Sequence, residues 1–180
     1  AMTTPAPTPV PTSQRNLDTI YGGGPFTWET AYAAVVEALP RMETAVYLGT
    51  VRPDGRPHSA GVGAFLQGGA LYVVSGPQTR KSRNLAANPR CTLSVRTSAG
   101  DVIFEGAAAR VIEPETLEAV AATAREGGWP AQVEGDALTA PYSAQSAGPP
   151  PWWLYRLAYD TVFGVATSEP FGATRWTFSD

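Results

Sequence analysis

The sequence of 180 residues contains a single cysteine, Cys91, and a single histidine, His58. One thiol excludes a disulfide framework within the chain, and we expect a protein of the reducing cytoplasm. One histidine excludes a metal site built from several histidines, and no metal is expected. A Ser-His-Asp triad would need His58 as its base, but the adjacent Ser59 would point to the opposite face of a strand. We interpret His58 as a strand-end or barrel-rim residue, with a place beside a bound ring as the alternative.

Long apolar runs are also missing. No stretch approaches the roughly eighteen consecutive apolar residues of a membrane span, and the N-terminus lacks the basic-then-apolar pattern of a secretory signal. The formal net charge of −3 provides no general attraction for nucleic acid. We therefore expect neither a membrane nor a nucleic acid as a partner.

The length suits one domain with a short N-terminal extension. Residues 3–16 carry four prolines and almost no bulky apolar side chains, a composition that cannot bury a core. We expect residues 1–26 to be a disordered or extended tail and residues 27–180 to form the folded domain.

Short apolar runs separated by tight turns dominate the rest of the chain. Three helices are expected at 28–39, 80–88 and 114–125, a long loop at 129–151, and seven strands at 44–52, 57–66, 70–75, 91–97, 101–112, 152–158 and 161–167. The pattern predicts a mainly β fold, a small six- to seven-stranded barrel with inserted helices, and disfavours a doubly wound parallel sheet.

The most informative segment joins the third expected strand to the second expected helix. The strand ends at Ser75, Thr79 is placed to cap the helix, and Arg80, Lys81 and Arg83 fill its first turn. Cations at a helix N-terminus oppose the helix dipole, whereas an anion placed there is attracted by the free N–H groups. The arrangement predicts a phosphate-binding site; the alternative is a solvated basic face on a surface helix.

Residues 59–64 form a second unusual stretch, in which small side chains occupy both faces of a strand. Gly61 and Gly63 weaken a strand unless a flat ligand or another backbone approaches closely. A planar cofactor would satisfy this pattern; tight barrel curvature or dimer packing are the alternatives.

Taken together, these residues resemble the pyridoxamine 5'-phosphate oxidase-like superfamily of flavin- and deazaflavin-binding split β-barrels. The resemblance covers about residues 27–178 and is most specific at 71–91, where an aromatic strand precedes Thr79-Arg80-Lys81, Asn84-Leu85 and Asn88-Pro89. It implies a homodimer of FMN-binding split-barrel type with the cofactor in a cleft between the subunits.

The resemblance also assigns the cofactor-binding residues, while it leaves any catalytic side chain unknown. Arg80 and Lys81 match the phosphate-gripping pair and Thr79 the assisting hydroxyl, and the remaining matches lie on two strand segments that would face the ribityl chain and the tricyclic ring: Val74 and Ser75, and Ser59, Ala60, Gly61 and Val62.

Two departures bear on which cofactor is implied. FMN-using members usually carry basic residues at both ends of the second-strand segment, where this chain has Ser59 and Ala64. The branch that uses the deazaflavin coenzyme F420 is more similar, through the pattern K-x-R-N-L at 81–85 and T-R-W at 174–176. The resemblance therefore implies an F420-dependent oxidoreductase that transfers a hydride to or from a small organic molecule. The alternatives are an FMN-dependent oxidase or reductase, and a protein that binds flavin, F420 or haem without turnover.

Overall fold

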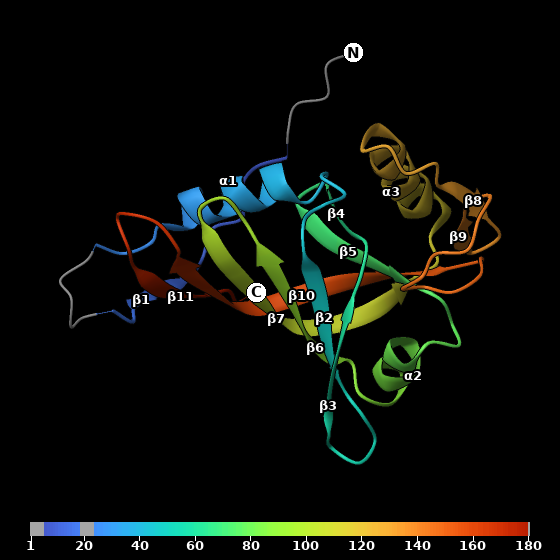
Figure 1. Ribbon diagram of the computed structural model, residues 1–180, viewed down its shortest axis with the longest axis horizontal. Coiled ribbons are helices and arrows are strands. Elements are labelled where there is room, and N and C mark those ends of the chain that lie inside the picture. The colour runs from blue at the N-terminus through green and yellow to red at the C-terminus, as the bar shows by residue number, and fades with distance from the viewer. Residues whose placement is uncertain (1–5, 19–23, 180) are drawn as a thin grey trace.

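The computed structural model describes residues 6–18 and 24–179 (Figure 1). Of the expected tail at 1–26, residues 1–5 and 19–23 lie outside the described residues. The helices are α1 (Trp28–Ala38), α2 (Arg80–Ala87) and α3 (Pro114–Glu126). The strands are β1 (Ser13–Asn16), β2 (Val46–Val51), β3 (Pro57–Gly61), β4 (Ala64–Gln67), β5 (Ala70–Ser75), β6 (Arg90–Arg96), β7 (Gly100–Val111), β8 (Gln132–Glu134), β9 (Ala137–Thr139), β10 (Trp153–Ala166) and β11 (Ala173–Thr177).

Within the described residues, nine strands form one antiparallel sheet around the long pair β7 and β10. On one side the order continues through β6 and β2 to β3. On the other side β10 pairs with β5 along its first half and with β11 along its second half. The mainly β architecture with inserted helices is confirmed, and β2 to β7 with β10 account for the seven strands that the sequence predicts.

The sheet changes course between β3 and β4, where the sequence predicts one strand over 57–66. The Val62 N–H donates to the Val46 carbonyl of β2, whereas the Gly63 carbonyl accepts from Val74 of β5, each at 3.2 Å. The chain thus crosses from one half of the barrel to the other within two residues. The prediction of a single strand was wrong because the small residues mark this crossing.

A second correction concerns β10, for which the sequence predicts two strands at 152–158 and 161–167. The strand is continuous, but its register with β7 shifts between Tyr159 and Thr161. The bulge brings backbone close to Gly106, where an added Cβ would lie 2.0 Å from the Ala158 carbonyl oxygen. Glycine at this position therefore permits the bend.

Four further strands lie in segments for which the sequence predicts no regular structure. β1 belongs to the N-terminal extension and pairs with β11, which follows the last expected strand. The expected loop at 129–151 contains the β8–β9 hairpin. Each of these strands is short, and its partner is distant in sequence or depends on tertiary packing, so local patterns do not reveal it.

Helices cover the sheet in two places and divide the core (Figure 1). Under α1, the buried Trp28 packs against Trp176 of β11, with ring centroids 5.3 Å apart. Under α3, Leu117 and Val120 pack in a second cluster with Trp152. Among the described residues, no helix is both long and apolar enough to cross a membrane.

Candidate functional site

The end of β5 and the beginning of α2 form a polar junction held by three hydroxyl groups. Thr79 caps α2: its Oγ1 accepts from the Ser82 N–H at 3.3 Å and donates to the Gly76 carbonyl at 2.8 Å. The Ser75 and Thr79 hydroxyl oxygens lie 2.7 Å apart, and the Ser82 hydroxyl donates to Ser75 at 2.8 Å. The predicted cap is therefore present. Ser82 was missed by sequence reasoning, although a hydroxyl three residues after a cap is a recognisable signal.

Lys81 is the most unusual residue of this junction. Its side chain is only 3% exposed, and its ammonium group donates to the carbonyl oxygen of Ser146. None of the ion pairs among the described residues involves Lys81. Burial lowers the pKa of Lys81 because the protein interior disfavours the charged form. A buried ammonium without a carboxylate is costly, and an anion bound beside it would lower that cost.

The other cations of α2 lie on its surface. Arg80 and Arg83 are both exposed, and no ion pair between described residues involves either one. The first intrahelical bond runs from the Arg83 N–H to the Thr79 carbonyl at 3.1 Å. Of the amides that precede it, that of Ser82 donates to the Thr79 hydroxyl, whereas those of Arg80 and Lys81 have no acceptor within the helix. The dipole favours negative charge at this end.

β3, which contains the first residues of the small-residue stretch at 59–64, lies beside α2. The structure therefore brings together the two segments for which the sequence predicts cofactor contacts. The pKa of His58 in β3 is lowered first by burial and then by the charges of Arg52, Lys81 and Arg80. Two of these cations belong to α2, which shows how close the helix is to the imidazole. Its Nδ1 is buried and has no hydrogen-bond partner among the described residues. α2 is also tied to β2, because the Asn84 side-chain amide donates to the Thr50 hydroxyl at 3.0 Å.

The predicted residues of β3 lie along an outer edge of the sheet. Ser59 is exposed, whereas Ala60, Gly61 and Val62 are half-buried. Within the described structure, β3 pairs only with β2, which leaves its other edge without a strand partner. An open edge of small residues is compatible with a flat ligand lying against the backbone.

Val74 occupies a different environment. Its side chain is buried in the cluster under α3, and its N–H donates to the Gly63 carbonyl. Ser75, the next residue, points into the hydroxyl network instead. Of this predicted pair, Ser75 is thus the one whose side chain belongs to the junction.

Tyr155 is a further polar residue at the junction. It belongs to β10, lies opposite Val73 of β5, and forms a side-chain hydrogen bond with Ser82. Burial raises the pKa of Tyr155, while the bond to Ser82 and the charge of Arg110 oppose that rise. Its phenol therefore stays protonated at neutral pH and contributes a hydroxyl to the network.

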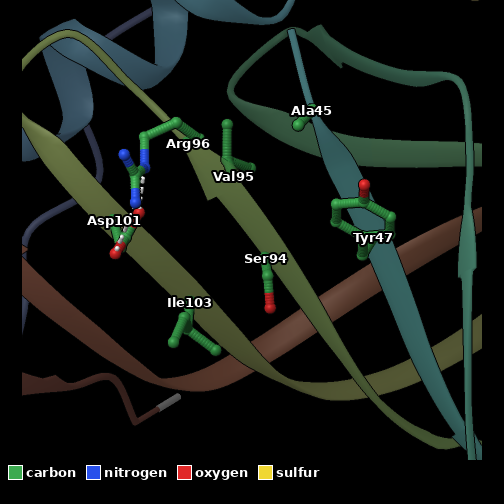
Figure 2. Close-up of a pocket in the computed structure, with 7 residues that line it drawn as sticks. All are labelled: Ala45, Tyr47, Ser94, Val95, Arg96, Asp101 and Ile103. Atoms are coloured by element: carbon green, nitrogen blue, oxygen red, sulfur yellow. Dashed lines mark hydrogen bonds and ion pairs between the residues drawn. The ribbon is translucent and has the colours of Figure 1, made fainter.

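A hollow of about 460 Å³ lies on a separate face formed by β2, β6 and β7 (Figure 2). Tyr47 and Ser94 line it, with Ile103 and the ion pair between Arg96 and Asp101. None of the predicted site residues lines this hollow, but Tyr47 is the cross-strand neighbour of Gly61. The hollow therefore borders β3. Within the described part of the chain, no group of three or more potential metal ligands is found.

Comparison with known proteins adds a family match. The family model described as pyridoxamine 5'-phosphate oxidase matches residues 33–166. No curated protein matches the chain. The match includes β2 to β7, α2 and β10, and thus the whole junction described above.

Solved structures show the same fold at low sequence identity. An FMN-binding protein related to pyridoxamine 5'-phosphate oxidase from Nostoc punctiforme has a TM-score of 0.58 and 18% identity, covering 85% of this chain and 91% of its own. PhzG from Burkholderia lata, in complex with tetrahydrophenazine-1-carboxylic acid, has a TM-score of 0.53 and 18% identity, covering 83% and 82%. A heme binding protein from Mycobacterium smegmatis has a TM-score of 0.50 and 21% identity, covering 78% of this chain and 57% of its own. The predicted split-barrel fold is confirmed.

Proposed function

The chain belongs to the pyridoxamine 5'-phosphate oxidase family, and on that premise we propose that it is an oxidoreductase that binds the deazaflavin coenzyme F420. The substrate would be a small organic molecule. The observation that carries the proposal is Lys81: a buried ammonium, without a carboxylate partner among the described residues, beside the N-terminus of α2. A phosphate group satisfies both the ammonium and the helix end.

The residues present fit such a cofactor. Lys81 and Arg80 would hold the phosphate, with the Thr79 hydroxyl beside them, and β3 would support the planar ring along Ser59 to Val62. The buried Nδ1 of His58 and Oδ1 of Asn84 lack partners among the described residues, which leaves polar groups available to a ligand. When bound, the deazaflavin supplies the hydride donor and acceptor; the protein positions the ring and limits access of water.

The exposed arginines favour F420 over FMN. One phosphate is served by Lys81, Arg80 and the helix end, which leaves Arg83 as an additional exposed cation on α2. F420 carries an acidic tail beyond its phosphate, and Arg83 would meet that tail. The T-R-W pattern gives no such support, because Trp176 is fully buried and donates to Gln14 at 3.1 Å.

We propose that the protein is a homodimer and that the face of β2, β6 and β7 contacts the second copy. Tyr47 lines the hollow and is 51% exposed. Val165 of β10, the cross-strand neighbour of the lining residue Asp101, is 45% exposed. Large exposed apolar side chains that border a hollow are typical of interaction surfaces. A dimer at this face would bring the second subunit next to Gly61 and enclose the ring site.

FMN is the second candidate, because the related structure from Nostoc punctiforme is described as an FMN-binding protein. Absorption titrations of the purified protein with F420, FMN and haem separate the possibilities. The proposal predicts the tightest binding for F420, followed by its reduction or oxidation in the presence of a suitable small molecule. Tight FMN binding without F420 binding would reverse the order of the two cofactors. Binding without turnover of any substrate panel would indicate a storage or shielding role.

A further inference from the structure

A turn formed by residues 144–148, here called the strap, lies against the junction of β5 and α2. The Ser146 carbonyl accepts a hydrogen bond from the Lys81 ammonium. The Ala147 carbonyl approaches Gly76 so closely that a Cβ at that glycine would lie 2.0 Å from its oxygen. The strap therefore contacts both the strand end and the first turn of the helix.

The strap is a small unit with its own hydrogen bonds. Ala144 and Gly148 exchange backbone hydrogen bonds of 3.0 and 2.7 Å, and Gly148 has a φ of +78°. The Gly148 carbonyl accepts from the Nε1 of the buried Trp152 at 3.0 Å. These bonds hold the strap together and attach it to the core beside β10. Its hold on Lys81 is a single bond to a neutral carbonyl.

That single bond is weaker than the bond that an anion would form. The ammonium already makes the bond to Ser146 charge-assisted, but a phosphate adds the attraction between opposite charges, which a neutral carbonyl does not supply. We propose that the strap is a gate. In the free protein the Ser146 carbonyl accepts the hydrogen bond of the Lys81 ammonium, and the phosphate of the cofactor displaces that carbonyl. This inference rests on the proposed function, since it gives the occupant of the phosphate site before the cofactor arrives.

Two glycines allow the strap to be opened selectively. In Gly148→Ala, a Cβ meets no atom within 4 Å but strains the positive φ, which weakens the closed strap. Gly135→Ala is the matched control, with a φ of +60° and equally open space in the turn between β8 and β9. Gly76→Ala is a second opening variant, because its Cβ pushes the Ala147 carbonyl away and its own φ lies outside the positive range.

The state of the strap can be read without any cofactor, because Lys81 is the only lysine in the sequence. An amine-reactive reagent, followed by peptide mass analysis, measures the exposure of Lys81 separately from the N-terminal amine. A left-handed alanine costs about 1–2 kcal/mol, so we expect roughly tenfold faster Lys81 labelling in Gly148→Ala than in Gly135→Ala. The apparent affinity for F420, or for FMN if that is the cofactor, should rise by the same factor.

Each outcome decides the inference. Faster labelling together with tighter binding in both opening variants supports a gate. Faster labelling with unchanged or weaker binding overturns it, because the strap would then be a wall of the site. Equal labelling in Gly148→Ala and Gly135→Ala also overturns it. If the parent protein binds neither F420 nor FMN, the proposed function and the gate both fail, while the labelling rates still test the contact between the strap and Lys81.

Discussion

Replacing Lys81 with methionine should stabilise the free protein and weaken cofactor binding. Methionine is an unbranched side chain one atom shorter than lysine, and it removes the charge. Lys81 is 3% exposed and none of the ion pairs between described residues includes it, so folding removes its charge from water without a compensating carboxylate. Replacing even a buried ion pair with apolar side chains is often neutral or stabilising by about 1–4 kcal/mol, and an ammonium without a carboxylate loses no ion-pair attraction on replacement. We expect the free energy of unfolding to rise by about 1–2 kcal/mol at neutral pH, at the lower end of that range, because the bond to Ser146 is lost.

The gain should depend on pH in a defined direction. Burial lowers the pKa of Lys81 from its ordinary value of 10.5, so the unfolded chain binds the proton more tightly than the folded one. The stability of the parent protein therefore rises with pH between the lowered pKa and 10.5, as the folded state loses its buried charge. The advantage of Lys81→Met should shrink over that window.

Urea denaturation of the free protein provides the assay, with Arg156→Met as the control. Arg156 is exposed on β10, and its replacement removes one positive charge without uncovering a buried group. The control should change the free energy of unfolding by no more than about 0.5 kcal/mol. A loss of more than about 1 kcal/mol in Lys81→Met, compared with that control, would show that the protein itself satisfies the ammonium. The argument for an anion at this position would then fail.

Three further predictions concern His58, Gly106 and Cys91. The pKa of His58 should lie below 6.5 in the free protein and rise when a phosphate-bearing cofactor offsets the surrounding cations. NMR titration of this single imidazole tests the prediction. A pKa that is unchanged at saturation with cofactor would show that the anion does not act on His58. Gly106→Ala should destabilise the protein by about 2 kcal/mol or more in urea denaturation, because the new Cβ meets the Ala158 carbonyl. Gly24→Ala, with no atom within 4 Å, is the control, and equal stability of the two variants would contradict the tight bulge. Burial raises the pKa of Cys91 to about 11, so a thiol reagent at about pH 8 should label it only on unfolding, and rapid labelling of the native protein would contradict its burial.

Local sequence signals were sufficient to predict the junction. Thr79 is a hydroxyl residue directly before a helical segment, and the cap that it forms depends on residues within one turn. The strand that precedes it ends at Ser75, as turn residues at 76–77 indicate. The predicted positions of β5 and α2 were therefore nearly correct, and the three cations were placed in the first turn of α2.

Long-range contacts were not predictable in the same way. Lys81 is buried because the strap, 65 residues away in sequence, lies over it. The contact is made by a backbone carbonyl, which every residue has, so the sequence does not indicate it. Sequence reasoning treated Thr174-Arg175-Trp176 as a mark of the cofactor family. In the structure Trp176 packs against Trp28 and bonds to Gln14, so the pattern serves to attach β1 and β11 to the core.

The measurement that tests the central claim most directly compares the affinity for coenzyme F420 with that for its phosphate-free deazaflavin core. The parent protein and Arg156→Met should both prefer the phosphorylated form, and the bond to Lys81 should contribute about 1.5–3 kcal/mol of that preference. In Lys81→Met the preference should fall by this contribution, while Arg80, Arg83 and the helix end keep the remainder and the affinity for the phosphate-free core is unchanged. An undiminished preference in Lys81→Met would contradict the claim that this buried ammonium binds the phosphate.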